Sequence, residues 1–106
     1  VRILRLEQIY PFPKKSLQRF ISKTPQAEIV WCQEEPENMG SWSFVDRRLE
    51  AVLTNSKCKY TRPVYAGRPE AASPATGTMS RHLREQKLLV NQALGLEKIK
   101  TATAAE

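Results

Sequence analysis

The feature that most constrains the fold of this chain is the alternation of short apolar runs with longer segments of helical period. The apolar runs cover residues 1–8, 27–33 and 61–66. The second run, AEIVWCQ, is apolar at consecutive positions, which is typical of a strand covered on both faces in a parallel sheet. Each run therefore predicts a β-strand.

A segment with apolar residues three or four positions apart follows each run. Pro13 suits the first position of a helix, and the Thr24-Pro25 pair should end that helix. The other two segments predict helices over 40–53 and 79–94. Strand followed by helix, three times, predicts an α/β fold: a three-layer βαβαβα unit with a small, mostly parallel sheet.

The length of 106 residues allows one domain, which we expect over residues 1–96. Three strands make a thin sheet, and the chain does not begin with methionine. These two observations predict a fragment that lacks the first strand and helix of its domain. Residues 97–106 carry no core signal and are expected to form a flexible tail.

The formal net charge is +6, but the basic residues are scattered and no aromatic platform is interleaved with them. We therefore expect no nucleic-acid partner. No apolar run approaches the roughly 18 residues of a membrane span. Cys32 is expected to be buried, and Cys58 lies in a polar stretch. Two cysteines and one histidine predict neither a disulfide framework nor a metal site, and an intracellular location is favoured.

Ligands of parallel sheets gather beyond the carboxyl ends of the strands, so the loops that follow the strands are the candidate sites. In WCQEEPENMG, Glu34 or Glu35 could act as a general acid or base. The alternative is structural, with either carboxylate pairing with an arginine or capping the following helix. In GRPEAASPATGTMS, Arg68, Ser73, Thr76 and Ser80 precede or begin a helix and suggest an anion site, or ordinary helix caps.

Three long motifs carry a family resemblance. LEQIYPFP, EIVWCQEEPENMGSW and YAGRPEAASPATG, followed by HLREQ, occur in this order. They resemble the C-terminal segment of the thiamin-diphosphate-dependent decarboxylating component of 2-oxoglutarate dehydrogenase. Met39 stands where many members of that family have glutamine, and Ala71 stands where many have serine.

The resemblance implies a transketolase C-terminal-like domain of an enzyme that decarboxylates 2-oxoglutarate and transfers succinyl to lipoyl groups in the citric acid cycle. It implies thiamin diphosphate and magnesium bound outside this segment, and no catalytic residue within it. The sequence also lacks the cofactor motif expected of such enzymes, GDG…N. The loop with Glu34, Glu35, Asn38 and Gly40 would organise the domain and subunit contacts.

The implied partners are a second copy of the parent chain and the dihydrolipoyl succinyltransferase of the complex. The implied location is the bacterial cytoplasm or the mitochondrial matrix. Regulation by AMP or acetyl-CoA would place phosphate on Arg62 and Arg68. Two other readings stay open at this point: a free-standing small-ligand or nucleotide-binding module, and a basic interaction domain for an acidic partner.

Overall fold

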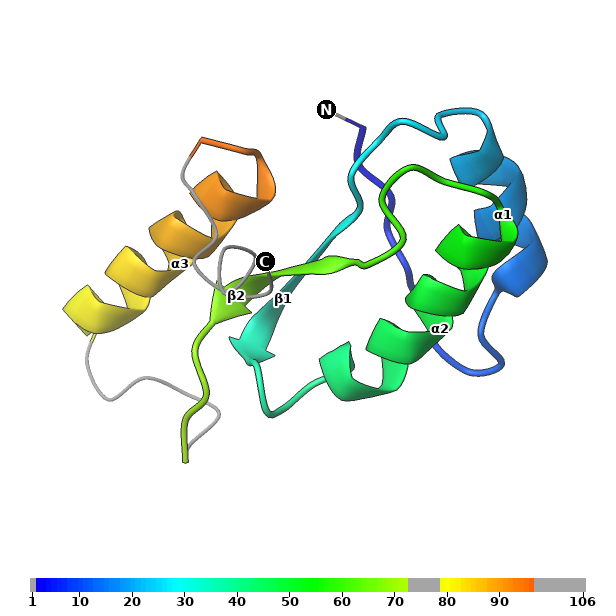
Figure 1. Cartoon of the computed structure of the whole chain (residues 1–106). Helices are drawn as coiled ribbons and strands as arrows, with labels where there is room; N and C mark the ends of the chain where they lie inside the picture. The colour runs from blue at the N-terminus through cyan, green and yellow to red at the C-terminus, as the bar shows by residue number, and fades with distance from the viewer. Residues whose placement is uncertain (1, 73–78, 97–106) are drawn as a thin grey trace. The chain divides into compact units, whose positions relative to one another are not determined.

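A computed structural model describes residues 2–72 and 79–96. The chain divides into two compact units (Figure 1). The first unit comprises Val1–Ile29 and Phe44–Pro63, and the second comprises Val30–Ser43 and Val64–Glu106. The order of elements is α1 (Lys14–Ser22), β1 (Val30–Pro36), α2 (Trp42–Asn55), β2 (Val64–Arg68) and α3 (Met79–Ala93).

The first unit is built around α1 and the greater part of α2, which lie side by side in Figure 1. Its core is formed by Ile21 of α1, Val52 and Leu53 of α2, and Cys58. The half-buried side chains of Phe12, Leu17 and Ile29 pack against this cluster. The helical spacing of the apolar residues thus turns one stripe of each helix inward.

The end of α2 has the geometry of a Schellman motif. Lys57 has a positive φ of 57°, and its N–H donates to the carbonyl of Thr54 at 3.1 Å. The N–H of Cys58 donates to the carbonyl of Leu53 at 3.2 Å, and both side chains belong to the core. Cys58 is therefore buried although its neighbours in the sequence are polar, because the left-handed residue before it turns the chain back onto the helix.

The second unit contains the two strands, which pair in parallel as predicted. Val30 pairs with Val64 and Cys32 with Ala66. α3 packs against both strands, with Leu89 as its buried residue. No helix among the described residues is long and apolar enough to cross a membrane.

The first predicted strand is not present, because residues 2–9 have no regular secondary structure. A strand needs a neighbour for its hydrogen-bond ladder, and the sheet in the described residues consists of β1 and β2. Ile3 is 80 % exposed and Leu4 is 50 % exposed, so this run contributes little to the core. The small α/β architecture is otherwise as expected, with two strands in the described part of the chain in place of three.

The other elements differ from their predicted bounds by a few residues. β2 begins at Val64 because Pro63 has no N–H to give to a ladder. β1 begins at Val30, opposite Val64, and continues to Pro36. α2 begins after Gly40, whose φ of 68° is incompatible with a right-handed helix. The predicted tail, 97–106, lies outside the described residues, and the transketolase-like topology stays a prediction.

Candidate functional site

The loops that follow β1 and β2 start at an irregularity in the ladder. Cys32 pairs with Ala66, and the next pair is Pro36 with Arg68. Three residues of β1 therefore stand opposite the single residue Gly67. Such a bulge bends the strand and changes the direction of its side chains. Here it turns the side chain of Gln33 into the loop.

Gln33 is 9 % exposed and holds the β1–α2 loop together. Its Nε2 lies 2.8 Å from the carbonyl oxygen of Met39, 3.0 Å from that of Pro36 and 3.2 Å from that of Glu35. The amide has two hydrogens for these three acceptors, so one of them is shared. Each carbonyl would otherwise be an unpaired polar group in a loop that is partly buried.

The oxygen of the same side chain accepts two further hydrogen bonds. Trp31 donates through its indole Nε1 at 2.8 Å, and the backbone N–H of Trp42 donates at 3.1 Å. Trp42 is the first residue of α2, so Gln33 caps that helix. The cap considered for Glu34 or Glu35 in the sequence is therefore supplied by the neighbouring glutamine.

Two glycines make room for this arrangement. A Cβ on Gly40, at its positive φ, would lie 3.0 Å from Nε2 of Gln33 and 3.1 Å from the Cβ of Glu35. A Cβ on Gly67 would lie 2.4 Å from the hydroxyl oxygen of Tyr65 and 2.6 Å from its Cζ. The glycine of the YAGRP motif is therefore required by the ring that precedes it, and no side chain fits there without a shift.

Tyr65 connects the two loops. Its hydroxyl lies 2.8 Å from the carbonyl oxygen of Arg68 and 3.2 Å from that of Glu35, and its single proton serves one of them at a time. Burial of the phenol, with a smaller contribution from the negative charge of Glu37, raises the pKa of Tyr65 to about 12. Its ring lies against Trp42 with the centroids 5.4 Å apart. The tyrosine therefore stays neutral at physiological pH and acts as a hydrogen-bond donor.

Asn38 and Glu37 form the remaining links. The side-chain amide of Asn38 donates to the carbonyl of Ala71 at 3.0 Å, and its oxygen accepts from the N–H of Ala71 at 3.1 Å. The backbone N–H of Glu37 donates to the carbonyl of Arg68 at 3.1 Å. Partial burial raises the pKa of the Glu37 carboxyl, and the nearby charge of Glu70 raises it further. The β1–α2 loop is thus bonded along its length to the loop after β2.

The predicted acid or base residues lie on the outside of this structure. Glu34 and Glu35 are both exposed, and neither forms an ion pair within the described part of the chain. Cys32 is also exposed, so the prediction of a buried cysteine in β1 is wrong. A two-stranded sheet leaves part of an apolar run uncovered, which consecutive apolar positions alone do not reveal.

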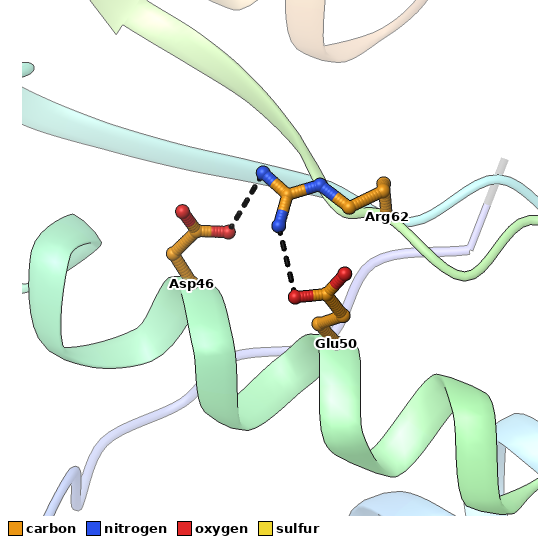
Figure 2. A network of polar contacts seen from close by, with 3 residues as sticks. All are labelled: Asp46, Glu50 and Arg62. Carbon is orange, nitrogen blue, oxygen red and sulfur yellow. Dashed lines mark hydrogen bonds and ion pairs between the residues drawn. The ribbon is translucent and has the colours of Figure 1, made fainter.

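The predicted anion-binding residues are distributed over the chain. Arg68 is 7 % exposed at the end of β2, and Ser80 is exposed in the first turn of α3. Ser73 and Thr76 lie outside the described residues. Arg62 belongs to the first unit, where it bonds to Glu50 at 3.0 Å and to Asp46 at 3.5 Å (Figure 2). Two carboxylates on α2 therefore already neutralise the Arg62 guanidinium.

Sequence reasoning missed Gln33 and Tyr65, the two side chains that make most of the contacts in the loops. The available signal was a glutamine directly after an apolar run, where a buried amide must find several partners. Within residues 2–72 and 79–96, no group of three His, Cys, Asp or Glu side chains could hold a metal ion. The arrangement is a closed structural junction between two loops.

Comparison with known proteins agrees with the motifs. Residues 1–94 match the family described as 2-oxoglutarate dehydrogenase C-terminal. Curated relatives from Brucella anthropi, Brucella ovis and Brucella melitensis are each 56% identical over 95 residues, which is 90% of this chain. Each is named 2-oxoglutarate dehydrogenase E1 component. The matched region is 10% of each relative's length, so the chain spans about a tenth of these proteins.

Proposed function

Because the chain belongs to the 2-oxoglutarate dehydrogenase C-terminal family, we propose that it is the C-terminal segment of an E1 component and serves that enzyme as a supporting domain. The parent chain would decarboxylate 2-oxoglutarate and pass the succinyl group to the lipoyl group of its partner enzyme. The match over residues 1–94, at 56% identity to named E1 components, is the observation that carries this proposal.

The geometry supports a structural role for the segment. The conspicuous motif residues bind one another, as Gln33 binds the backbone of its own loop and Tyr65 binds the carbonyls of Glu35 and Arg68. Groups that are already hydrogen-bonded inward are poorly placed to bind a substrate. The proposal therefore assigns this region to the assembly of the parent enzyme, including contacts in a homodimer and in the multienzyme complex.

Thiamin diphosphate and magnesium are proposed to bind elsewhere in the parent enzyme. Magnesium at a diphosphate prefers carboxylate and carbonyl oxygens arranged around one point. The described residues contain no such group of acidic side chains, so the donor set here does not fit the cofactor. No catalytic step is assigned to this segment.

Regulation by AMP or acetyl-CoA, the second proposal for this segment, would need a phosphate site at Arg62 and Arg68. Of its two arginines, Arg62 is bonded to Asp46 and Glu50, and Arg68 is buried. A nucleotide phosphate on Arg62 would have to displace both carboxylates. If Arg62→Gln in the parent enzyme left the response to added AMP and acetyl-CoA unchanged, Arg62 would have no part in such a site.

A paired assay tests the main proposal. The parent chain and this 106-residue segment are each supplied with 2-oxoglutarate, thiamin diphosphate, magnesium and an artificial electron acceptor. The parent is expected to turn over and the segment to be silent. Turnover by the segment alone would overturn the supporting role, and an inactive but folded parent would overturn the enzymatic assignment.

A variant of the parent enzyme tests the supporting role directly. Gly67→Ala, which forces a Cβ against Tyr65, is expected to lower the melting temperature and the dimer content of the parent. Arg84→Gln, an exposed change on α3 of the same unit, is the control and should leave both unchanged. Equal behaviour of the two variants would contradict the role assigned to the junction.

A further inference from the structure

The charge of this chain is divided unequally between the two units. The first unit contains eleven Lys and Arg residues and four Asp and Glu residues, a net charge of +7. The second unit contains six basic and seven acidic residues, a net charge of −1. The excess positive charge, which looks scattered along the sequence, therefore belongs entirely to the first unit.

Within the first unit, three of the four acidic residues form ion pairs with two arginines. Asp46 and Glu50 both bind Arg62 (Figure 2), and Glu7 lies 3.7 Å from Arg5. Glu28 is the fourth acidic residue and is exposed. Three of the four negative charges in the unit are thus committed to two cations.

Two other arginines lie on aromatic rings. The guanidinium of Arg2 is 4.3 Å from the ring centroid of Phe20, and that of Arg48 is 3.6 Å from the centroid of Phe44. The other seven cations of the unit are all exposed, and one of them, Lys59, also has its ammonium 5.3 Å from the ring centroid of Tyr60. The seven are Lys14, Lys15, Arg19, Lys23, Arg47, Lys57 and Lys59. Against these seven stands the single carboxylate of Glu28.

Three of the seven cations lie along α1 and its C-terminal end and two lie in the turn after α2, and we refer to these five as the basic face: Lys15, Arg19, Lys23, Lys57 and Lys59. The first three are spaced four residues apart, which places them in a row on one side of the helix, about 6 Å apart. The turn after α2 joins the end of this row, because the N–H of Lys59 donates to the carbonyl of Pro25 at 2.9 Å. Figure 1 shows α1 beside the end of α2.

The chemistry of the face restricts its partner. A membrane-binding helix exposes apolar side chains beside its cations. On α1, Ile21 is buried in the core and Leu17 packs against it, so the helix offers no apolar face to insert. Duplex DNA would present about seven phosphates along the roughly 12 Å that the row spans, which is more than twice the three cations of the row, so the two charge spacings do not match. The exposed ring of Tyr60, next to Lys59 in the sequence, has the ammonium of Lys59 5.3 Å from its centroid.

An extended polypeptide fits the spacing better. In a strand, side chains on one side repeat every second residue, about 6.7 Å apart. Carboxylates at alternate positions would therefore meet the row of cations one by one. We propose that the basic face of the first unit is a docking surface for an extended acidic segment of another protein chain. The residues of this surface belong to the first unit, whereas those of the loop junction belong to the second, and the proposal does not rest on the activity of the parent enzyme.

Fluorescence anisotropy of the 106-residue chain with a labelled peptide tests this surface. The probe is a peptide of about twelve residues with glutamate and serine alternating, and its control has glutamine in place of glutamate. Arg19→Gln with Lys23→Gln removes two charges from the basic face. Arg84→Gln with Lys87→Gln removes the same two residue types from the exposed side of α3 in the second unit.

The acidic peptide is expected to bind, and the Arg19/Lys23 variant to bind it about fivefold more weakly. The Arg84/Lys87 variant should change the affinity less than twofold or so, since its charges lie in the other unit. Binding should weaken as sodium chloride rises from about 50 to about 300 mM, because exposed charges are screened. Binding of the glutamine peptide with equal affinity would overturn the proposal.

Two other probes separate the alternatives. A duplex DNA oligonucleotide bound more tightly than the acidic peptide, with loss in the Arg19/Lys23 variant, would replace the proposed partner by nucleic acid. Preferential binding to anionic phosphatidylserine vesicles would replace it by a membrane surface. Equal losses in both charge variants would mean that net charge, and not the basic face, attracts the peptide.

Discussion

The loop junction of the second unit and the basic face of the first unit use polar side chains in opposite ways. At the junction, Gln33 and Tyr65 bond to backbone groups of their own unit. At the basic face, Lys15, Arg19 and Lys23 are exposed and form no ion pair with the carboxylates of residues 2–72 and 79–96. Buried polar groups must be paired, whereas exposed cations need no partner to be stable.

The difference separates two kinds of sequence signal. Two of the three family motifs form the junction, where one glycine or one amide decides whether a loop can close, and the other motif, LEQIYPFP, lies in the first unit. The basic face has no motif, and it emerges only when the fold brings α1 next to the turn after α2. Motif residues at the junction should therefore be sensitive to small changes, and residues of the basic face should tolerate them.

Among the single substitutions considered, Gln33→Glu at the junction is expected to destabilise the chain most. The glutamate cannot donate to the three carbonyls that the amide serves, and at pH 7 it places a charge among them. We expect a loss of about 4 kcal/mol in the free energy of unfolding. Urea denaturation followed by tryptophan fluorescence measures it, because both tryptophans, Trp31 and Trp42, lie in this unit.

The loss from Gln33→Glu should also depend on pH. Burial and the carbonyl oxygens would raise the pKa of the new carboxyl in the folded state above the unfolded value of about 4.3. The charge-related loss therefore appears above about pH 4, grows as the pH rises and shrinks in acid. Glu34→Gln, the reverse change at the next, exposed position, should cost less than about 0.5 kcal/mol. Equal costs for the two variants would contradict the role of Gln33.

Gly67→Ala should be the next most damaging change. The new Cβ would lie 2.4 Å from the hydroxyl oxygen of Tyr65, so the ring or the strand must move, at a cost of about 3 kcal/mol. Tyr65→Leu in the same background removes most of the ring and should recover part of the loss. Gly95 has open space around it, and alanine there meets only the strain of a φ of 78°. An alanine at Gly67 that costs no more than one at Gly95 would refute the steric argument.

The order and type of the later elements could be predicted from the sequence because they follow from periodicity. The spacing of Val45, Leu49, Val52 and Leu53 was sufficient to predict α2, and all four are buried. The strand expected over 1–8 was wrong, because an apolar run specifies a strand only if another strand is available to pair with it. That availability is a property of the fold and not of the run.

The loops were less predictable, because their structure depends on contacts between distant residues. Tyr65 reaches the carbonyl of Glu35, thirty positions earlier, and Asn38 pairs with Ala71. The sequence drew attention to Glu34 and Glu35 as carboxylates, although the neutral Gln33 beside them forms the bonds. A bulge that reverses which side chain points inward cannot be read from alternation alone.

Tyr65→Phe should destabilise the junction less than Gln33→Glu or Gly67→Ala. The variant keeps the ring and loses the hydroxyl that bonds to the carbonyl of Arg68, so we expect a cost of about 1 kcal/mol. Because the folded pKa of about 12 exceeds the unfolded value of about 10, the folded state favours the neutral phenol. The advantage of tyrosine over phenylalanine is therefore complete below about pH 10 and declines as the pH rises towards 12.

Absorbance titration of the phenolate provides the measurement. The ionisation step near pH 12 should be missing from the Tyr65→Phe variant and present in the wild type. If the two titrations were the same, the phenol would not be held in the buried environment described here.

The smallest expected effect, Lys57→Gly, links stability to the basic face. Lys57 occupies the left-handed position of the Schellman motif, where glycine has no steric penalty and lysine does. Replacement by glycine should therefore stabilise the chain by about 0.5 kcal/mol, after the greater flexibility of unfolded glycine is subtracted. Thermal unfolding followed by circular dichroism measures this gain, and Lys57→Arg, which keeps both the charge and the strain, is the control.

If Lys57 serves the basic face, the glycine variant should be more stable and bind the acidic peptide more weakly, whereas the arginine variant should change neither. A glycine variant that is less stable would show that the left-handed turn is not the conformation that lysine strains.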